Sequence, residues 1–238
     1  MRYPTPDGMT STRASAHALL AIALLQACAI WFHPQAPADS ADTWMHGLAA
    51  IAPQASHLHL LLVASVVAAW LLLGALGACW PSPAMARGAE RLYGLGAAAM
   101  VAGAMINGFA LGRFAQWATT DGQAHADAAP AVAMFAFSLN QALAGFGLVA
   151  TSLAILLWSL GVRASPGPWS RATHRVGVGI SALCVAGYAI GLVDTDVAGI
   201  ATVTLAQCAW YALAALTVLR GGIAPAQHPL PPHRADSP

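Results

Sequence analysis

The chain has 238 residues; 58% of them are hydrophobic and only 8% are charged, whereas a typical soluble domain has about 25% charged residues. Ten arginines, with no lysine, face nine acidic residues, so the net charge is +1. These values exclude a disordered chain, a nucleic-acid-binding protein and an ordinary soluble enzyme. They predict an all-α integral membrane protein that spans the bilayer several times.

Long stretches without a charged residue predict six transmembrane helices. A helix that crosses a bilayer needs roughly 20 predominantly apolar residues, each adding about 1.5 Å to its length. In chain order, the predicted helices cover residues 14–32, 57–79, 92–113, 132–160, 175–193 and 198–219. The uncharged stretch 128–162 is too short for two spans, so we interpret it as one long or tilted helix.

The two ends of the chain differ in composition from the helices. Residues 1–13 are predicted to form a short cytoplasmic segment, and residues 14–220 the six-helix transmembrane domain. Residues 221–238 are rich in proline and are predicted to be a disordered cytoplasmic tail. Arginines precede the first apolar stretch as in a secretory signal, but apolar residues continue past a weak cleavage box at Cys28, so we retain this stretch as a helix.

Arginine placement predicts the orientation of the bundle. With six spans both termini lie on one side, which carries nine of the ten arginines; the opposite side carries only Arg113. That opposite side instead holds Asp39, Asp42, Asp121, Asp127, Asp194 and Asp196. Since loops rich in arginine remain in the cytoplasm, we predict that both termini are cytoplasmic. The alanine-rich, lysine-free composition favours a bacterial protein, and hence a multi-pass inner-membrane location.

The first predicted outer loop, residues 33–56, contains a candidate amphipathic helix. Asp42 or Thr43 is placed to cap its start, and Pro53 to end it. Its large apolar residues fall on one helix face; these are Trp44, Met45, Leu48 and Ile51. We therefore predict a short interfacial helix that lies on the outer leaflet.

Two pairs of glycines with a four-residue spacing, Gly108/Gly112 and Gly187/Gly191, form GxxxG motifs. In lipid, small residues let helix backbones approach closely, because apolar surface alone gives helices little reason to associate. We expect these glycines to pack helices within the bundle. The alternative is a homodimer interface through one of the two pairs.

The middle of the predicted spans holds no charged residue, but it does hold amides and a phenol. At about 1.5 Å per residue, these groups lie about 9–15 Å below the predicted outer surface. They are Gln26, Asn107, Asn140, Gln141, Tyr188 and Gln207. A buried amide without a partner costs several kcal/mol in hydrocarbon, so these groups must face one another, water or a ligand.

Two interpretations of this polar layer remain open. The first is that its members form hydrogen bonds that hold the helices together. The second is an outward-opening polar pocket, for which the predicted ligand-binding residues are Asn107, Asn140, Gln141, Tyr188 and Gln207.

Histidines near the outer surface are candidate metal ligands, since imidazole suits zinc, copper and nickel. His57 and His59 begin the second predicted helix, above the polar layer. Rings two residues apart lie about 200° apart on a helix, so both could bind one ion only if His57 precedes the helix. Haem b would need histidines on facing helices; His17 and His174, at similar depth near the inner face, are the candidates, with simple helix-end residues as the alternative.

Catalytic and nucleotide-binding motifs are missing from the sequence. It contains no P-loop, dinucleotide fingerprint, nucleophile elbow or zincin motif, so it implies no nucleotide and names no reaction or catalytic residue. We therefore expect a binding or permease-like membrane protein that holds a small neutral or weakly polar ligand in the outward-facing pocket. The alternatives are a metal- or haem-dependent membrane enzyme or redox protein that uses the outer histidines, and an accessory subunit of a membrane complex.

Overall fold

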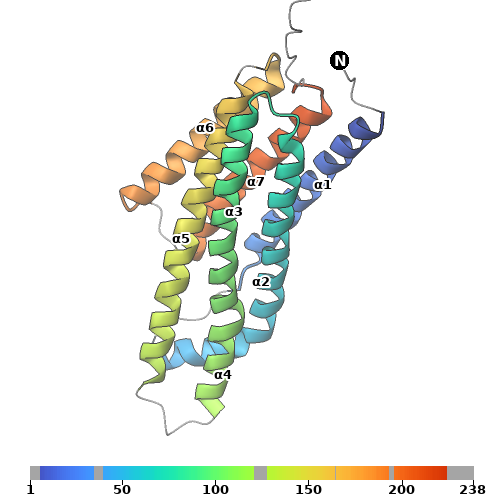
Figure 1. The fold of residues 1–238 in the computed structure, drawn as a ribbon. Coiled ribbons are helices and arrows are strands. Elements are labelled where there is room, and N and C mark those ends of the chain that lie inside the picture. The colour runs from blue at the N-terminus through green and yellow to red at the C-terminus, as the bar shows by residue number, and fades with distance from the viewer. Residues whose placement is uncertain (1–5, 35–39, 121–127, 164, 193–195, 224–238) are drawn as a thin grey trace, which may run out of the picture.

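The computed structural model describes residues 6–34, 40–120, 128–163, 165–192 and 196–223. This part of the chain is helical throughout, with short connections and no strand (Figure 1). The elements are α1 (Pro6–Trp31), α2 (Ala41–Gly77), α3 (Pro83–Met105), the π-helical segment η1 (Ile106–Leu111), α4 (Gly112–Thr120), α5 (Ala129–Val162), α6 (Pro168–Ala189) and α7 (Val197–Leu219). The predicted all-α class is confirmed.

Five segments within the described residues are long and apolar enough to cross a membrane. They are Thr10–Trp31, Thr43–Gly77, Pro83–Thr120, Ala129–Val162 and Val197–Leu219. The remaining long helix, α6, carries Arg171, His174 and Arg175 in its first half, which lowers its hydropathy. The sixth span therefore stays a prediction, whereas the multi-helix membrane character of the chain is supported.

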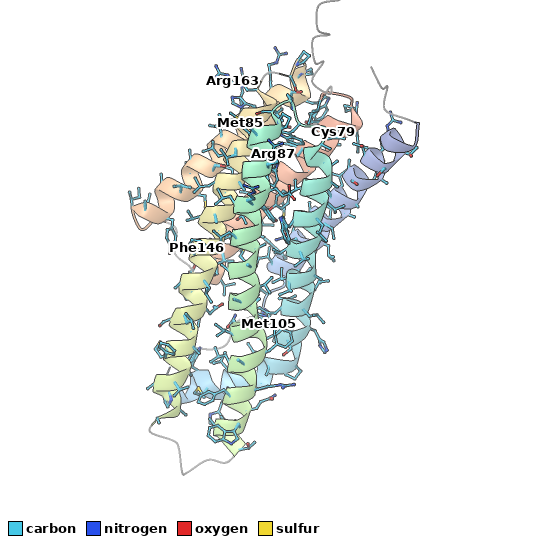
Figure 2. All side chains as sticks on the ribbon, in the orientation of Figure 1. Cys79, Met85, Arg87, Met105, Phe146 and Arg163 are labelled. Atoms are coloured by element: carbon cyan, nitrogen blue, oxygen red, sulfur yellow. The ribbon has the colours of Figure 1, made fainter. Side chains whose placement is uncertain are left out.

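Large apolar side chains cover the outside of the bundle, as expected for a surface that faces lipid. Leu24 on α1 is 69% exposed, Phe135 on α5 is 70% exposed and Leu183 on α6 is 75% exposed. Met105 and Phe146, which Figure 2 labels along the length of α3 and α5, are also about half exposed. In water such a surface would be unfavourable, and in hydrocarbon it is not.

Arginines gather at one end of the bundle. Figure 2 shows Arg87 and Arg163 at the end where α2 turns into α3. Figure 1 shows that α1 begins and α7 ends at this same end, which we call the arginine end. Of the eight arginines in the described residues, seven lie in or directly beside the parts of α1, α3, α5, α6 and α7 nearest this end, and only Arg113, at the start of α4, lies toward the other end.

The main core fills the half of the bundle near the arginine end. Trp158 and Trp210 stack there with ring centroids 6.0 Å apart, and the hydroxyls of Tyr93 and Tyr211 share a 2.9 Å hydrogen bond between α3 and α7. These aromatic side chains are almost fully buried. The half of the bundle near the arginine end is thus densely packed, whereas the opposite half contains a cavity.

The predicted interfacial helix is the first part of α2, and its predicted limits were wrong. Ser40 caps the helix, because its hydroxyl accepts a hydrogen bond from the amide of Thr43 at 3.1 Å. Pro53 does not end α2 but lies inside it, and the helix continues to Gly77. Figure 1 shows that the first part of α2 runs across the bundle and that the rest runs along it. A proline inside a helix removes one backbone hydrogen bond and kinks the helix rather than always stopping it.

The apolar face of this first part of α2 packs on protein. Met45 is 4% exposed and belongs to a small second core with Leu111, Ala115 and Ala133. Trp44 meets Phe137 of α5 edge to face, with centroids 6.0 Å apart. This part of α2 therefore packs on α4 and α5 away from the arginine end, and contact with the outer leaflet stays a prediction.

The second and third predicted helices are shorter than the helices of the structure. The third predicted helix, 92–113, lies within the helical run Pro83–Thr120. The second, 57–79, overlaps α2, which begins earlier at Ala41 and ends two residues sooner at Gly77. The predicted helices are limited to long apolar stretches, whereas contacts in the second core also hold more polar segments in helical form at the end away from the arginines. The predicted cytoplasmic segment 1–13 is also partly helical, because α1 begins at Pro6; the predicted tail, from residue 224 onward, lies outside the described residues.

Candidate functional site

A cavity of about 120 Å³ lies between α1, α2, α3, η1, α5 and α7, in the half away from the arginine end. Most of its wall is aliphatic, from residues such as Ile30, Val63, Val101 and Leu148. Polar side chains also line it; they are Gln26, His33, His59, Asn107, Asn140, Gln141 and Thr204. We call this space the inner cavity.

A second hollow of about 290 Å³ adjoins the inner cavity. Its wall includes Trp44, Leu48 and Ala52 from the first part of α2, and Asp196 at the start of α7. We call this space the vestibule. The two spaces share His33, His59, Asn107, Phe137, Gln141 and Val197, so these residues stand where the vestibule meets the inner cavity.

Two histidines face each other at this junction. The Nε2 atoms of His33 and His59 are 3.5 Å apart, and the rings meet edge to face with centroids 5.0 Å apart. His59 is 5% exposed. Each Nδ1 lies next to a backbone carbonyl, at 2.9 Å from Pro34 O and 2.8 Å from Ala55 O.

The His33 imidazole, which follows the end of α1, is held in its neutral form. Burial, together with the nearby His59, lowers the pKa of His33 to about 4, although its hydrogen bond to Pro34 acts in the opposite direction. At pH 7 this ring is therefore uncharged, and one of its nitrogens carries a free lone pair.

Asn107 reaches the histidine pair from the π-helical segment. Its Nδ2 lies 3.1 Å from His59 Nε2. The next residue, Gly108, lets α2 approach, because a Cβ at this position would overlap the His59 side chain. The Ser56 hydroxyl donates to the Gly108 carbonyl at 2.7 Å. Single π-helical turns within α-helices are often found at functional sites, and this one brings Asn107 to the junction.

Two buried amide oxygens at the cavity have no hydrogen-bond partner. They are Oε1 of Gln26, a residue that is only 2% exposed, and Oε1 of Gln141. Ser159 Oγ and Trp210 Nε1 are also without a partner among the described residues, but both lie close to Gly177 and outside the cavity wall. The unpartnered acceptors at the pocket are thus the two glutamines.

The predicted ligand-binding residues separate into two groups. Asn107, Asn140 and Gln141 line the inner cavity together. Gln207, which is 1% exposed, instead donates to Thr151 Oγ1 at 2.9 Å and to Ser152 Oγ at 3.0 Å, and so joins α7 to α5.

Tyr188 does not line the cavity. This residue is 40% exposed, and its hydroxyl lies against the backbone of α5 at Gly145. The depth of the polar layer was therefore a sound guide, but depth alone did not tell which of its members share a wall.

The predicted histidine pairs are not brought together by the fold. His57 is exposed and lines neither space, whereas His59 faces His33. His17 bonds its own helix at Arg13 O, and His174 bonds Ser159 O of α5, both at 2.9 Å. His17 therefore bonds within α1 and His174 bonds α5, so the two residues have separate contacts rather than a shared site.

The sequence analysis did not assign His33 or Gln26 to the predicted site. His33 had been placed in an outer loop, and Gln26 had been noted only as a member of the polar layer. Gln26 lies in the last turns of α1, and His33 follows the end of this helix. Two polar side chains close to one end of an apolar helix are the signal that could have included both residues in the site.

The glycine motifs have roles within the chain. Gly108 and Gly112 both face α2, where Cβ atoms would meet His59 and Ala52. Gly191 has a positive φ of 69° and ends α6: Leu192 N donates to Gly187 O at 2.8 Å and Gly191 N to Tyr188 O at 3.3 Å. This is the Schellman arrangement of helix ends, which favours glycine. A homodimer interface stays a prediction.

Comparison with protein-family models, with curated proteins and with solved structures gives no match for this chain. The chemistry of the cavity is therefore the guide to function.

Proposed function

We propose that this protein is a multi-pass membrane protein that binds a small, neutral, hydrogen-bonding molecule in the inner cavity. The observation that carries the proposal is a pair of buried amide oxygens, Gln26 Oε1 and Gln141 Oε1, which have no hydrogen-bond partner among the described residues and belong to residues that line one cavity. Leaving such a group unpaired costs about 1–3 kcal/mol. A ligand that donates hydrogen bonds to these oxygens recovers that free energy on binding.

The walls of the cavity indicate the chemistry of the ligand. A cavity of about 150 Å³ holds benzene, so a space of about 120 Å³ suits a molecule with only a few non-hydrogen atoms. Arginine and acidic side chains are missing from its described lining, and an unpaired charge would be costly to bury there. A small alcohol or amide, with one apolar side and one hydrogen-bond donor, fits these walls.

The vestibule supports entry from the end opposite the arginines. Its residues lie between the inner cavity and the outer ends of α4 and α5. With arginine loops in the cytoplasm, both termini lie inside and the vestibule opens to the outside of the inner membrane. This arrangement is that of a permease-like or ligand-sensing protein.

A thermal-unfolding screen with small neutral alcohols and amides tests the proposal. The full chain in lipid nanodiscs is compared with a double variant, Gln26→Leu with Gln141→Leu. We expect at least one compound to stabilise the wild type, by about 2.7 kcal/mol when its concentration is 100 times Kd, and to leave the double variant unchanged.

Ser138→Ala is the matched control for this screen. Ser138 lies on the same helix as Gln141 but is exposed, and its hydroxyl bonds the Met134 carbonyl of its own helix. This variant should respond like the wild type. If no compound separates the wild type from the double variant, the cavity binds no such molecule and the proposal fails.

A further inference from the structure

We propose that His33 and His59 form a binding site for a divalent transition-metal ion of the zinc type, with the side chain of Asn107 as third ligand. The site lies at the junction of the vestibule and the inner cavity. It goes beyond the small-molecule pocket and rests on a different observation, the geometry of the two imidazoles.

The backbone fixes the tautomer of both rings. The Nδ1 atoms lie 2.9 Å from Pro34 O and 2.8 Å from Ala55 O. A carbonyl oxygen only accepts, so each Nδ1 carries the hydrogen and each neutral ring presents a lone pair at Nε2. Histidines that bind metals show the same arrangement, in which the second ring nitrogen donates to a carbonyl or carboxylate.

The distances between the donor atoms fit one tetrahedral ion. With zinc–nitrogen bonds of about 2.0–2.1 Å, two ligands of a tetrahedral ion are about 3.3–3.4 Å apart. The two Nε2 atoms are 3.5 Å apart, and Asn107 Nδ2 is 3.1 Å from His59 Nε2. Turning the Asn107 amide over places its oxygen where the nitrogen lies, so that an oxygen donor stands about 3.1 Å from His59 Nε2 as a third ligand.

Contacts within the protein do not account for this arrangement. Because both Nε2 atoms are acceptors, the 3.5 Å approach of His33 to His59 is not a hydrogen bond. Asn107 donates to His59 alone. Two lone pairs that converge in a buried place repel each other, and a cation between them turns this repulsion into attraction.

The surroundings favour a cation with an open coordination position. Asp196, which caps α7 through its contact with Gly199 N, lines the vestibule beside the histidines and adds negative charge there. No group of three His, Cys, Asp or Glu side chains occurs in the described residues. The protein therefore supplies two nitrogens and one amide oxygen, and the fourth position remains for water or a small molecule, as in open zinc sites.

Zinc titration of the untagged full chain in nanodiscs, after treatment with a chelator, tests the proposal. We expect the wild type to bind Zn²⁺ at a site that His33→Ala and His59→Ala each weaken by on the order of 100-fold, since even an outer partner of a metal-binding histidine contributes about 10–100-fold. His57→Ala is the matched control: His57 lies on the same helix but is exposed. It should bind like the wild type.

Substitutions of Asn107 separate a ligand from a structural hydrogen bond. Asn107→Asp has nearly the same shape but offers a carboxylate, so it should bind Zn²⁺ at least as tightly as the wild type, whereas Asn107→Leu should bind it more weakly. Co²⁺ added to the wild type should give the intense visible absorption of a tetrahedral ion, and His33→Ala should lose it.

Two results would overturn the metal site. One is Zn²⁺ binding by the wild type no stronger than that by the His33→Ala, His59→Ala double variant, which retains every other histidine. The other is an equal loss of binding in His57→Ala. The small-molecule screen runs in the presence of chelator, so either proposal can fail without the other.

Discussion

Gln26 and Gln207 are both buried amides, with exposed fractions of 2% and 1%, yet their surroundings differ. Gln207 donates to two hydroxyls of α5. The Gln26 oxygen instead has no donor among the described residues, and Gln26 lines the inner cavity. The two interpretations left open by the sequence thus both occur in one polar layer. Which one applies to a residue depends on what faces its side chain.

Substitution of Gly108 tests the close approach of α2 at the site. Gly108→Ala would place a Cβ against His59, and overpacking of this kind costs about 1–3 kcal/mol. We expect a lower unfolding temperature and weaker Zn²⁺ binding. The control is Gly179→Ala on α6, where a Cβ would meet nothing within 4 Å and where alanine should stabilise the helix by about 0.5–1 kcal/mol.

At the residue scale, sequence was a good guide to depth and a poor guide to direction. Counting along helices correctly placed Asn107, Asn140 and Gln141 at one level. Each residue turns a helix by about 100°, so the wall that a side chain faces depends on how the whole helix is rotated in the bundle. Tyr188 of α6 was predicted to line the pocket, but its hydroxyl packs against α5 at Gly145. The prediction was wrong because the sequence alone does not show how α6 is rotated in the bundle.

At the element scale, the π-helical segment η1 connects α3 to α4 and carries the Asn107 amide to the histidines. The sequence gives little warning of it beyond Gly108, since glycine is about 1 kcal/mol less favourable than alanine in a helix. A widened turn disturbs the regular ladder of backbone hydrogen bonds. The Ser56 hydroxyl from α2 compensates at one place, where it donates to the Gly108 carbonyl.

Removing this hydroxyl should loosen η1. Ser56→Ala should lower the free energy of unfolding by about 1–3 kcal/mol, the cost of a buried acceptor without a partner. Hydrogen exchange should then increase in residues 106–111. Ser15→Ala removes a hydroxyl that bonds only the Ser11 carbonyl of its own helix and should change little; an equal effect of both substitutions would contradict this role of Ser56.

The boundaries of the elements show a second limit of sequence reasoning. Helix existence followed from long uncharged stretches, but α2 was expected to begin after Pro53 and begins at Ala41. The sequence predicts a helix cap at Asp42 or Thr43, whereas Ser40 caps α2. It also predicts a helix end at Pro53, which lies inside α2. The second core around Met45 and Leu111, which extends the helices, depends on contacts between distant segments.

At the scale of the whole molecule, the bundle is longer than a bilayer is thick. The helical run Pro83–Thr120 has 38 residues, or roughly 57 Å at 1.5 Å per residue, against about 30 Å for the hydrocarbon core. Part of this helical run therefore lies outside the hydrocarbon unless the bundle is strongly tilted. In the proposed orientation the vestibule lies in the part that projects outward, where a polar ligand would reach it from water.

Fusions at the C-terminus test the orientation. With α6 as a sixth span, both termini are cytoplasmic, so a fluorescent protein fused after Pro238 should fluoresce and an alkaline phosphatase at the same position should be inactive. Arginine at the cytoplasmic side is the physical reason. An active phosphatase fusion would show the reverse orientation or an odd number of spans.

We propose that the polar layer has two parts: a pocket that includes Gln26, and interhelical hydrogen bonds that Gln207 makes. Thermal unfolding of Gln26→Leu and Gln207→Leu, without added ligand, measures this division directly. Loss of Gln207 removes the donor to two buried hydroxyl oxygens, those of Thr151 and Ser152, and should cost about 1–3 kcal/mol. Removal of the unpartnered Gln26 oxygen should leave stability equal or higher. If Gln26→Leu is destabilised as much as Gln207→Leu, Gln26 holds the bundle together and the pocket loses the acceptor on which its proposed function depends.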